Sequence, residues 1–363
     1  KTDEHRVGLT PDAVHEYVAA GHSVTVETKL GAGIEASDED YKKAGARIAA
    51  TAADVFAGAD MIVKVKEPLA PERKMLRKGQ ILFTYLHLAA DRAQADDLIK
   101  SGCTAVAYET VTDSSGALPL LAPMSEVAGR LSIEAAGAAL RRYAGGRGIL
   151  LGGVPGVLPA RVVIIGGGVV GTHAARMAVG LNAEVTILDR SIKRLRELDD
   201  MLQGRVRTRY ATTHAIGQEI GEADAVIGAV LVPGASAPKL IRRDMLATMK
   251  RGAVIVDVAV DQGGCCETTK PTTHSDPTYI VDGVVHYCVA NMPGSVPLTS
   301  SQALNNATLP FGLALANKGL AALKESPHLL AGLNIHDGQV TCQPVAASLQ
   351  LPFVPPEQAL ARV

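Results

Sequence analysis

The chain has 363 residues, a length that predicts two domains. Hydrophobic residues make up 47% of it and charged residues 20%, which excludes an intrinsically disordered chain and allows a sizeable core. Lysine and arginine total 36 against 37 acidic residues, and tryptophan is absent. A nucleic-acid partner is therefore excluded, because it requires a basic surface and aromatic side chains that stack on bases.

The first part of the chain alternates short apolar runs with longer amphipathic segments. Thr10 and Pro11 begin a predicted helix that ends at Gly21, because a threonine cap, an early proline and a terminal glycine are typical helix boundaries. Helices are also predicted over 38–45 and 91–100, and strands over 23–27, 61–66, 80–85 and 104–108. Strands separated by helix-length connections pair in parallel, so this part predicts a doubly wound sheet.

The second part begins with a long alanine-rich helix predicted over 125–143, and helices of this kind often connect two domains. A glycine-rich stretch interrupted by proline, 145–156, predicts a loop. Strands are then predicted over 161–165, 184–189, 205–210, 223–228 and 253–257, with one more at 284–287. A helix is predicted over 172–181, and a second long helix follows over about 299–323.

Neither a membrane span nor a signal peptide is expected. The longest weakly polar region, 148–160, is interrupted by glycine and proline and is shorter than the ~20 residues of a spanning helix. The five cysteines form no CxxC pair, which is typical of reduced thiols in the cytoplasm. We expect the adjacent Cys265 and Cys266 to be half-buried loop residues. Metal ligation is the alternative, but no neighbouring ligand supports it, so no metal is expected.

A glycine-rich turn carries the first functional signal. An apolar, β-branched strand leads directly into residues 166–171, GGGVVG, which form a GxGxxG sequence at the start of a helix. Gly166 permits the tight turn, Gly168 lets the backbone approach a pyrophosphate, and Gly171 lets the helix pack against the strand. The helix N-terminus offers N–H groups to the phosphates. This context predicts dinucleotide binding, and an ordinary strand–helix turn is the alternative.

Asp189 ends the next strand, roughly 20 residues after the first glycine, where dinucleotide-binding domains place an acid on the ribose. A carboxylate accepts both ribose hydroxyls and repels a 2′-phosphate, so NAD is favoured over NADP. A helix cap is the alternative role for Asp189. Arg190 could pair with a 2′-phosphate, although a solvated side chain is the simpler interpretation.

These patterns predict an α/β protein: two doubly wound, Rossmann-like parallel-sheet domains with a cleft between them, linked by long helices. The carboxyl ends of parallel strands face the ligand crevice, and polar side chains follow three strands of the first sheet there. Strand alternation places Lys64 and Lys66 on one side, so at least one reaches the crevice, and His87 and Glu109 follow the next two strands. Singly, each could be structural. Asp261 follows the fifth strand of the second sheet, where a turn residue is the alternative to a catalytic one.

Several sequence blocks resemble NAD-dependent L-alanine dehydrogenase, in order along essentially the whole chain. They are EHRV (4–7), LTP (9–11), KVKEP (64–68), FTYLHLA (83–89), AYET (107–110), PMSEVAGR (123–130), GGVPG (152–156), DVAVDQGG (257–264) and VANMPG (289–294). Some of them are shared with the NAD-binding subunit of proton-translocating transhydrogenase. The blocks around Lys66, His87 and Asp261 together point more to the dehydrogenase.

The resemblance implies residue roles. Arg6 would bind the substrate carboxylate, Lys66 would hold the carboxylate or the carbonyl oxygen, and His87 would be the general acid/base. Asp261 would act beside it, near the nicotinamide. The remaining implied site residues are Met124 and Asn291 for the substrate, and Ser125, Gly166, Gly168, Val169, Val170, Gly171, Asp189 and Arg194 for the cofactor.

The resemblance also implies a discontinuous substrate domain, 1–122 plus 300–363, an NAD-binding domain over 123–299, and a cytoplasmic homohexamer. Two departures from the family pattern stand out. Family chains begin with a short strand ahead of the region equivalent to 1–6, so we expect a truncated N-terminus, which would endanger the placement of Arg6. Arg190 stands where an uncharged residue is usual, which makes strictness for NAD less certain.

The implied activity is reversible oxidative deamination of L-alanine to pyruvate and ammonium, with NAD⁺ as hydride acceptor. A pocket for a small side chain would also admit glycine, serine or 2-aminobutyrate. Small molecules are the expected partners, without nucleic acid or membrane. Two alternatives stay open: the NAD(H)-binding subunit of a transhydrogenase, which needs a membrane partner, and an NAD-binding oligomer without catalysis.

Overall fold

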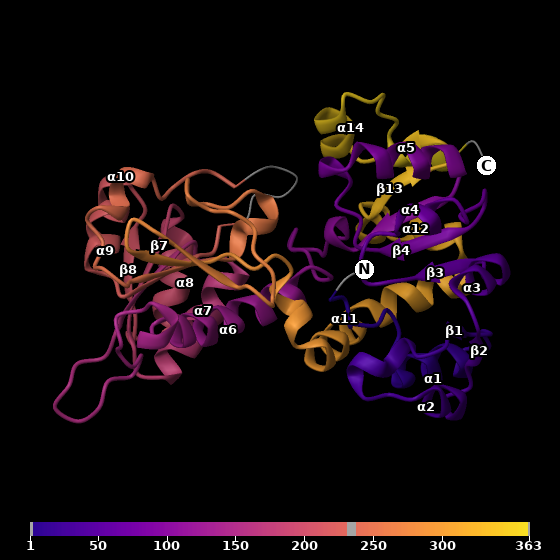
Figure 1. Ribbon diagram of the computed structural model, residues 1–363. Coiled ribbons are helices and arrows are strands. Elements are labelled where there is room, and N and C mark those ends of the chain that lie inside the picture. Colours follow the sequence, from indigo (N-terminus) through magenta and orange to yellow (C-terminus); the bar gives the residue numbers. More distant parts are fainter. Residues whose placement is uncertain (1–2, 231–236, 362–363) are drawn as a thin grey trace. The chain divides into compact units, whose positions relative to one another are not determined.

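A computed structural model describes residues 3–230 and 237–361, and the chain divides into two compact units (Figure 1). The first contains residues 1–124 and 296–363, and the second contains residues 125–295. Helix α6 (Ala122–Ala139) leads into the second unit, and α11 (Pro297–Lys318) begins the returning segment. The boundaries expected from the sequence were 122/123 and 299/300.

The first unit is built on a five-stranded sheet of order β14–β13–β5–β4–β3. Strands β3 (Met61–Val63), β4 (Ile81–Thr84) and β5 (Thr104–Ala107) pair in parallel, as expected. Two antiparallel strands that the sequence did not predict extend this sheet: β13 (Leu333–His336) pairs with β5, and β14 (Gln339–Val340) pairs with β13. The predicted 23–27 strand becomes β1 (Thr25–Glu27), which pairs with the unpredicted β2 (Arg47–Ala49) in a separate small sheet.

The helices of the first unit begin at the residues that the sequence favours. Thr10 caps α1 by accepting a hydrogen bond from the N–H of Ala13, and Gly102 ends α5 in the left-handed region. The elements are α1 (Pro11–Ala19), η1 (Leu30–Ile34), α2 (Asp38–Lys43), α3 (Ala52–Gly58), α4 (Ala70–Arg73), η2 (Leu88–Ala90), α5 (Arg92–Ser101), η3 (Tyr108–Thr110), α11, α12 (Leu320–Glu325), α13 (Pro327–Leu330), α14 (Gln343–Leu349) and α15 (Pro356–Leu360).

The second unit is built on a seven-stranded sheet of order β11–β12–β10–β9–β6–β7–β8. From β6, the next two strands step in one direction and the following ones step in the other, which is the strand order of a dinucleotide-binding fold. The strands are β6 (Arg161–Ile165), β7 (Glu184–Asp189), β8 (Arg207–Tyr210), β9 (Ala225–Gly228), β10 (Val254–Asp257), β11 (Thr278–Val281) and β12 (Val284–Tyr287). All neighbours pair in parallel except the edge strand β11, which is antiparallel to β12 and which the sequence missed.

Helices cover both faces of this sheet, so its central strands β6, β9 and β10 are almost entirely apolar. Val162 and Ile164 of β6 pack into one buried cluster, and Val163 and Ile165 pack into another on the opposite face. The remaining elements of the unit are η4 (Arg142–Ala144), α7 (Val169–Gly180), α8 (Ile192–Leu202), α9 (Thr213–Glu222), α10 (Arg243–Leu246), η5 (Val258–Gln262) and η6 (Met292–Ser295).

Three predicted helices had wrong boundaries. The helix predicted over 125–143 spans Ala122–Ala139, and the one predicted over 172–181 begins at Val169, inside the glycine motif. The helix predicted over 299–323 is two helices, because Gly319 (φ +54°, ψ −131°) adopts a backbone conformation that interrupts α11 before α12. No helix in the described part of the chain is long and apolar enough to cross a bilayer.

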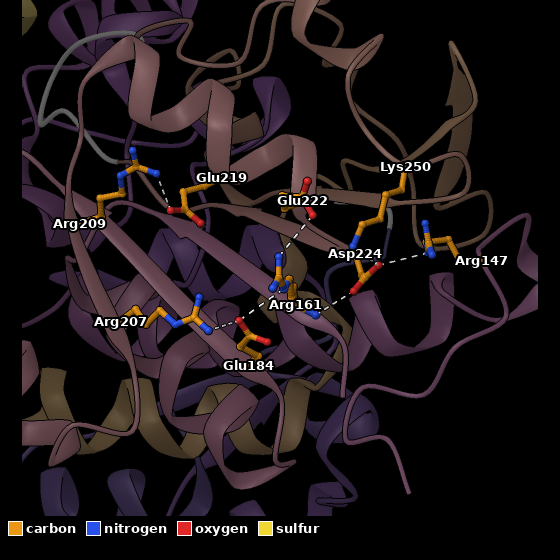
Figure 2. Close-up of polar contacts among 9 residues, drawn as sticks. All are labelled: Arg147, Arg161, Glu184, Arg207, Arg209, Glu219, Glu222, Asp224 and Lys250. Carbon is orange, nitrogen blue, oxygen red and sulfur yellow. Dashed lines mark hydrogen bonds and ion pairs between the residues drawn. The ribbon is translucent and has the colours of Figure 1, made fainter. Parts of the chain in front are cut away.

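The amino edge of the second sheet carries a network of ion pairs (Figure 2). Asp224, whose side chain is 8% exposed, pairs with Lys250 (Nζ–Oδ1 3.1 Å) and Arg147 (Nε–Oδ1 3.2 Å) and accepts a hydrogen bond from the N–H of Arg161 (2.9 Å). Farther along this edge, Glu184 pairs with Arg161 and Arg207, and Glu222 pairs with Arg161. Away from the edge, Glu219 of α9 pairs with Arg209, near the carboxyl end of β8. Each of these acids is therefore paired with at least one basic side chain.

Candidate active site

The glycine turn at the carboxyl end of β6 has the shape that a pyrophosphate requires. Gly166 has φ +104°, and a Cβ there would lie 2.6 Å from the carbonyl oxygen of Ala229. A Cβ on Gly171 would lie 1.9 Å from the carbonyl oxygen of Gly166, so the helix packs directly on the turn. Gly168 is the N-cap of α7 and has no side-chain cap, and a Cβ there would meet no atom within 4 Å. The turn therefore fits a dinucleotide cofactor, with the N-terminus of α7 turned to the phosphates.

Asp189 lies beside this turn and is half-buried at the end of β7. Its Oδ2 accepts a hydrogen bond from the N–H of Gly167, and its Oδ1 accepts one from the N–H of Ser191, both at 2.7 Å. A carboxylate oxygen accepts more than one hydrogen bond, so both oxygens can also accept ribose hydroxyls. Arg190, next along the chain, is exposed.

The Arg194 side chain supports the glycine turn through hydrogen bonds. It donates to the carbonyl oxygen of Gly167 (2.6 Å) and to Oγ1 of Thr172 (2.7 Å), and it pairs with Glu197 (2.7 Å). These contacts hold α8 against the start of α7, so Arg194 fixes the glycine turn through the carbonyl oxygen of Gly167. Its direct contact with the cofactor stays a prediction. The same holds for Val169 and Val170 in the first turn of α7 and for Ser125, which is half-buried on α6.

Arg6 is 7% exposed and is held by a carboxylate that the sequence analysis did not single out. Its Nε and Nη2 form a two-pronged pair with Glu4, at 2.7 and 2.6 Å. Its Nη1 lies 3.1 Å from Sδ of Met124, so two predicted substrate residues are in contact. The two-pronged pair with Glu4 fixes the orientation of the guanidinium plane.

The two lysines after β3 have different partners. Val65 is 4% exposed, and the lysines on either side of it are half-buried, which agrees with the predicted alternation. Lys64 pairs with Glu72 (2.9 Å). Lys66 is half-buried, and its carbonyl oxygen accepts a hydrogen bond from Oγ1 of Thr84 at the end of β4 (3.1 Å). Within residues 3–230 and 237–361, no side chain pairs with its ammonium. Lys66 is thus the lysine that can bind a ligand.

His87 is exposed just beyond β4, with φ +51°, a strained region for a residue with a side chain. Glu109 holds it there: its Oε1 accepts a hydrogen bond from the N–H of His87 (2.6 Å), and both of its oxygens accept from the N–H of Leu86 (3.2 Å). The structure thus brings Glu109 and His87 together at the carboxyl ends of these strands, and the carboxylate of Glu109 holds the backbone there.

Tyr85 links Arg6, His87 and Glu109, and the sequence gave no sign of this. Its ring centroid lies 5.8 Å from that of His87, and burial raises the pKa of its hydroxyl, an effect that the Arg6 cation partly opposes and the Glu109 carboxylate adds to. The protonated hydroxyl donates to the carbonyl oxygen of Leu120 (2.5 Å). The hydrogen bond to Leu120 therefore fixes the ring that packs near His87.

In the second unit, Asp261 lies on η5, directly after β10, and is exposed. Its Oδ2 accepts a hydrogen bond from the N–H of Asn291 (3.4 Å), which has φ +61°. The structure thus brings these two predicted site residues together. Asp189 and the glycine turn lie at the same carboxyl edge of this sheet, beyond β7 and β6.

Cys265 and Cys266 are fully buried rather than half-buried. Burial raises the pKa of both thiols, and the Asp257 carboxylate adds to the effect. Protonated thiols are poor metal ligands and poor nucleophiles. Among the described residues, no three histidine, cysteine or acidic side chains are grouped as a metal site.

Family models place these features in context. The model described as "Alanine dehydrogenase/PNT, C-terminal domain" matches residues 132–343, and "Alanine dehydrogenase/PNT, N-terminal domain" matches residues 1–128. The chain belongs to the alanine dehydrogenase/PNT family. The glycine turn, Asp189 and Asp261 lie within the C-terminal family domain, and Arg6, Lys66 and His87 lie within the N-terminal one.

Relatives within this family match nearly the whole chain. An alanine dehydrogenase of Halomonas elongata is 58% identical over 98% of this chain and 96% of its own length. One from Mycolicibacterium smegmatis is 52% identical over 99% of this chain and 98% of its own length. Among solved structures, an L-alanine dehydrogenase matches with a TM-score of 0.92 and 51% identity, covering 96% of this chain and 97% of that one. A transhydrogenase from Sinorhizobium meliloti matches with a TM-score of 0.80 and 26% identity, covering 94% and 97%.

Proposed function

We propose that this member of the alanine dehydrogenase/PNT family catalyses reversible oxidative deamination of L-alanine to pyruvate and ammonium, with NAD⁺ as hydride acceptor. The observation that carries the proposal is the 51–58% identity, over nearly the full length, to proteins named alanine dehydrogenase. The geometry of both units supports it. The first is assigned as the substrate domain and the second as the NAD-binding domain.

Arg6 and Lys66 fix the substrate carboxylate. The guanidinium is almost fully buried and is locked by Glu4, so it presents Nη1 in one orientation. The half-buried ammonium of Lys66 supplies a second positive charge for the carboxylate or the developing carbonyl oxygen. A substrate held by two cations keeps its Cα–H bond in one direction, which converts binding energy into correct orientation. Met124, in contact with Arg6, would line the side-chain pocket.

His87 moves the protons. The ammonium group of alanine first loses a proton to solvent, and hydride departure from Cα then leaves an iminium group. Water adds to the iminium carbon while the imidazole takes one proton of that water and passes it to nitrogen. As the C–N bond breaks, the imidazole takes the hydroxyl proton of the carbinolamine, and ammonia then takes up that proton, so pyruvate and ammonium are formed. An imidazole suits this task, because its ordinary pKa of ~6.5 lets it gain and lose a proton near neutrality. The hold of Glu109 on the His87 backbone fixes where the ring begins.

Asp261 supplies a negative charge near the reacting nitrogen, where it stabilises the iminium. Asn291 holds this carboxylate through its N–H. The nicotinamide supplies the redox chemistry when NAD is bound. Gly166, Gly168 and Gly171 would hold the pyrophosphate, with Val169 and Val170 at the helix N-terminus, and Asp189 would hold the ribose.

The proposal includes assembly as a homohexamer in the cytoplasm. Large apolar side chains are exposed on η4 and on the loop that leads to β6: Tyr143, Leu150, Val154, Val157 and Leu158. Exposed large apolar side chains that gather in one segment are typical of a surface that another protein covers, which supports association between copies. The five cysteines are free and buried, as is usual for a protein of a reducing compartment.

The test is NADH formation by the purified protein with L-alanine and NAD⁺, compared with a His87→Gln variant. Loss of the imidazole should lower kcat at least 100-fold, because general acid/base catalysis contributes roughly 10²–10⁴-fold. Since the side chain is exposed, the melting temperature should stay unchanged. Unchanged kcat in the variant would remove His87 from the mechanism. NADH binding without any turnover of alanine by the wild type would overturn the proposed activity and favour a transhydrogenase-type or non-catalytic NAD-binding protein.

A further inference from the structure

A buried carboxylate organises the loop that carries Asp261. Asp257 ends β10, is 0% exposed, and caps η5 by accepting a hydrogen bond from the N–H of Ala259 at Oδ1 (3.1 Å). Its Oδ2 accepts hydrogen bonds from the N–H groups of Cys265 (2.9 Å) and Cys266 (3.2 Å) and from the hydroxyl of Thr269. One side chain therefore fixes both the beginning of the Asp261 loop and the segment that follows it.

The atoms around the Asp257 carboxylate are closely packed. A Cβ on Gly228 would lie 2.4 Å from Sγ of Cys265 and 3.0 Å from Oδ1 of Asp257. Gly264 has φ +78°, and a Cβ there would lie 2.7 Å from Oδ2 of Asp257. The thiol of Cys265, kept protonated by burial and by the neighbouring carboxylate, donates to Oδ1 (3.5 Å). The loop thus packs closely around the Asp257 carboxylate.

A lysine grips the same loop by its carbonyl oxygens. The Lys239 ammonium donates to the carbonyl oxygens of Gly263 (2.6 Å), Gly264 (2.9 Å) and Cys266 (3.1 Å). Backbone N–H groups on either side of Lys239 bind the two other carbonyls of the loop. The N–H of Ala237 donates to the carbonyl oxygen of Gln262, and the N–H groups of Leu240 and Ile241 donate to that of Cys265. Every carbonyl from 262 to 266 is therefore satisfied by the segment 237–241.

We propose that Asp257 and Lys239 are positioning residues that hold the 258–266 loop from its N–H and C=O sides and thereby fix the Asp261 carboxylate for catalysis. Asp257 takes N–H groups and Lys239 takes carbonyls, and both hold Cys266, which lies just after the segment that carries Asp261. A loop that a carboxylate holds by its N–H groups and an ammonium holds by its carbonyls should keep its position whether or not a ligand is bound. This role rests on the proposed function, because it acts through Asp261.

The test uses Lys239→Met, which keeps the length of the side chain and removes its charge, and Lys239→Arg, which restores donors. Lys250→Met is the matched control, because Lys250 is also a lysine of the second unit with a polar partner, Asp224, but lies at the opposite edge of the sheet. In Lys239→Met, hydrogen–deuterium exchange of the amides of 263–266 should rise at least tenfold. Its kcat should fall about tenfold, while KM for alanine and Kd for NADH stay within twofold. Lys239→Arg should recover kcat to within threefold of the wild type.

Asp257→Asn should have a larger effect, about a hundredfold in kcat, because the amide places N–H donors against the backbone N–H groups. If this variant does not fold, the lysine variants still decide. Wild-type exchange and kcat in Lys239→Met, or equal losses in Lys250→Met, would overturn the proposal. If the wild type does not oxidise alanine, the proposed function fails, while the exchange measurement still tests the grip on the loop.

Discussion

The two edges of the second sheet use charged side chains in opposite ways. At the amino edge, acids and bases pair with one another, with Asp224 between Arg147 and Lys250 (Figure 2). At the carboxyl edge, the acids accept hydrogen bonds from backbone N–H groups instead: Asp189 from Gly167, and Asp257 from Cys265.

This difference separates stability from function within one domain. Acids and bases that pair with one another stabilise the fold and leave few hydrogen-bonding sites for a ligand. A carboxylate on backbone N–H groups fixes the loop around it and keeps lone pairs for further donors. The first unit repeats the second arrangement, because Glu109 follows β5 and holds the backbone of His87. Loop-holding acids at carboxyl strand ends are therefore the feature that both units share.

The largest expected effect concerns the glycine turn at the carboxyl edge. Gly171→Val should destabilise the protein by about 3 kcal/mol and abolish NADH binding, because even a Cβ would lie 1.9 Å from the carbonyl oxygen of Gly166. Gly168→Ala should keep the melting temperature, since a Cβ there meets nothing within 4 Å, yet weaken NADH binding at least tenfold by blocking the phosphates. Thermal unfolding and NADH fluorescence titration measure both effects.

Gly180→Ala is the matched control on the same helix, since its Cβ also meets nothing and it lies at the far end of α7. It should bind NADH as the wild type does. Tight NADH binding by Gly168→Ala would show that no pyrophosphate approaches this backbone.

The next effect concerns the amino edge. Asp224→Asn should lower the free energy of unfolding by about 2 kcal/mol, because it removes the charge that Arg147 and Lys250 share. It should leave kcat and KM for alanine unchanged. Urea unfolding and steady-state kinetics are the measurements. A fall in kcat with unchanged stability would erase the distinction between the two edges.

The smallest effect is expected at the outer end of that network. Arg207 is 65% exposed and pairs with Glu184. Arg207→Ala should change the free energy of unfolding by less than about 0.5 kcal/mol, because exposed pairs are screened by water and salt. The same urea titration measures it, and a loss as large as that of Asp224→Asn would mean that the amino edge acts as one cooperative network.

Much of the parallel architecture could be predicted from the sequence, because buried parallel strands are continuous apolar runs. The β6–α7 turn and β7 are clear examples, with their glycines and terminal acid in a fixed order. The strands that escaped prediction lack this signal: β2 is half-exposed and three residues long, and β11 pairs antiparallel at an edge where polar residues are tolerated. Chain order alone also gave no sign that β13 joins the first sheet.

The candidate site divides in the same way. Residues that match a family pattern, such as Arg6 and His87, could be found by the resemblance. Their supports, such as Glu4 and Lys239, could not, because a side chain that bonds to backbone or to a near neighbour has no characteristic spacing. Strand alternation placed Lys64 and Lys66 on one side, but it could not tell which of the two would pair with Glu72, as Lys64 does.

The most direct test of the account is hydride transfer from Cα of alanine. The purified protein should be incubated with L-alanine deuterated at Cα and unlabelled NAD⁺, and the products should be examined by NMR. The account predicts that deuterium appears at C4 of the nicotinamide ring of NADH, with pyruvate and ammonium formed in equal amounts. Unlabelled NADH, or pyruvate formed without NADH, would contradict it.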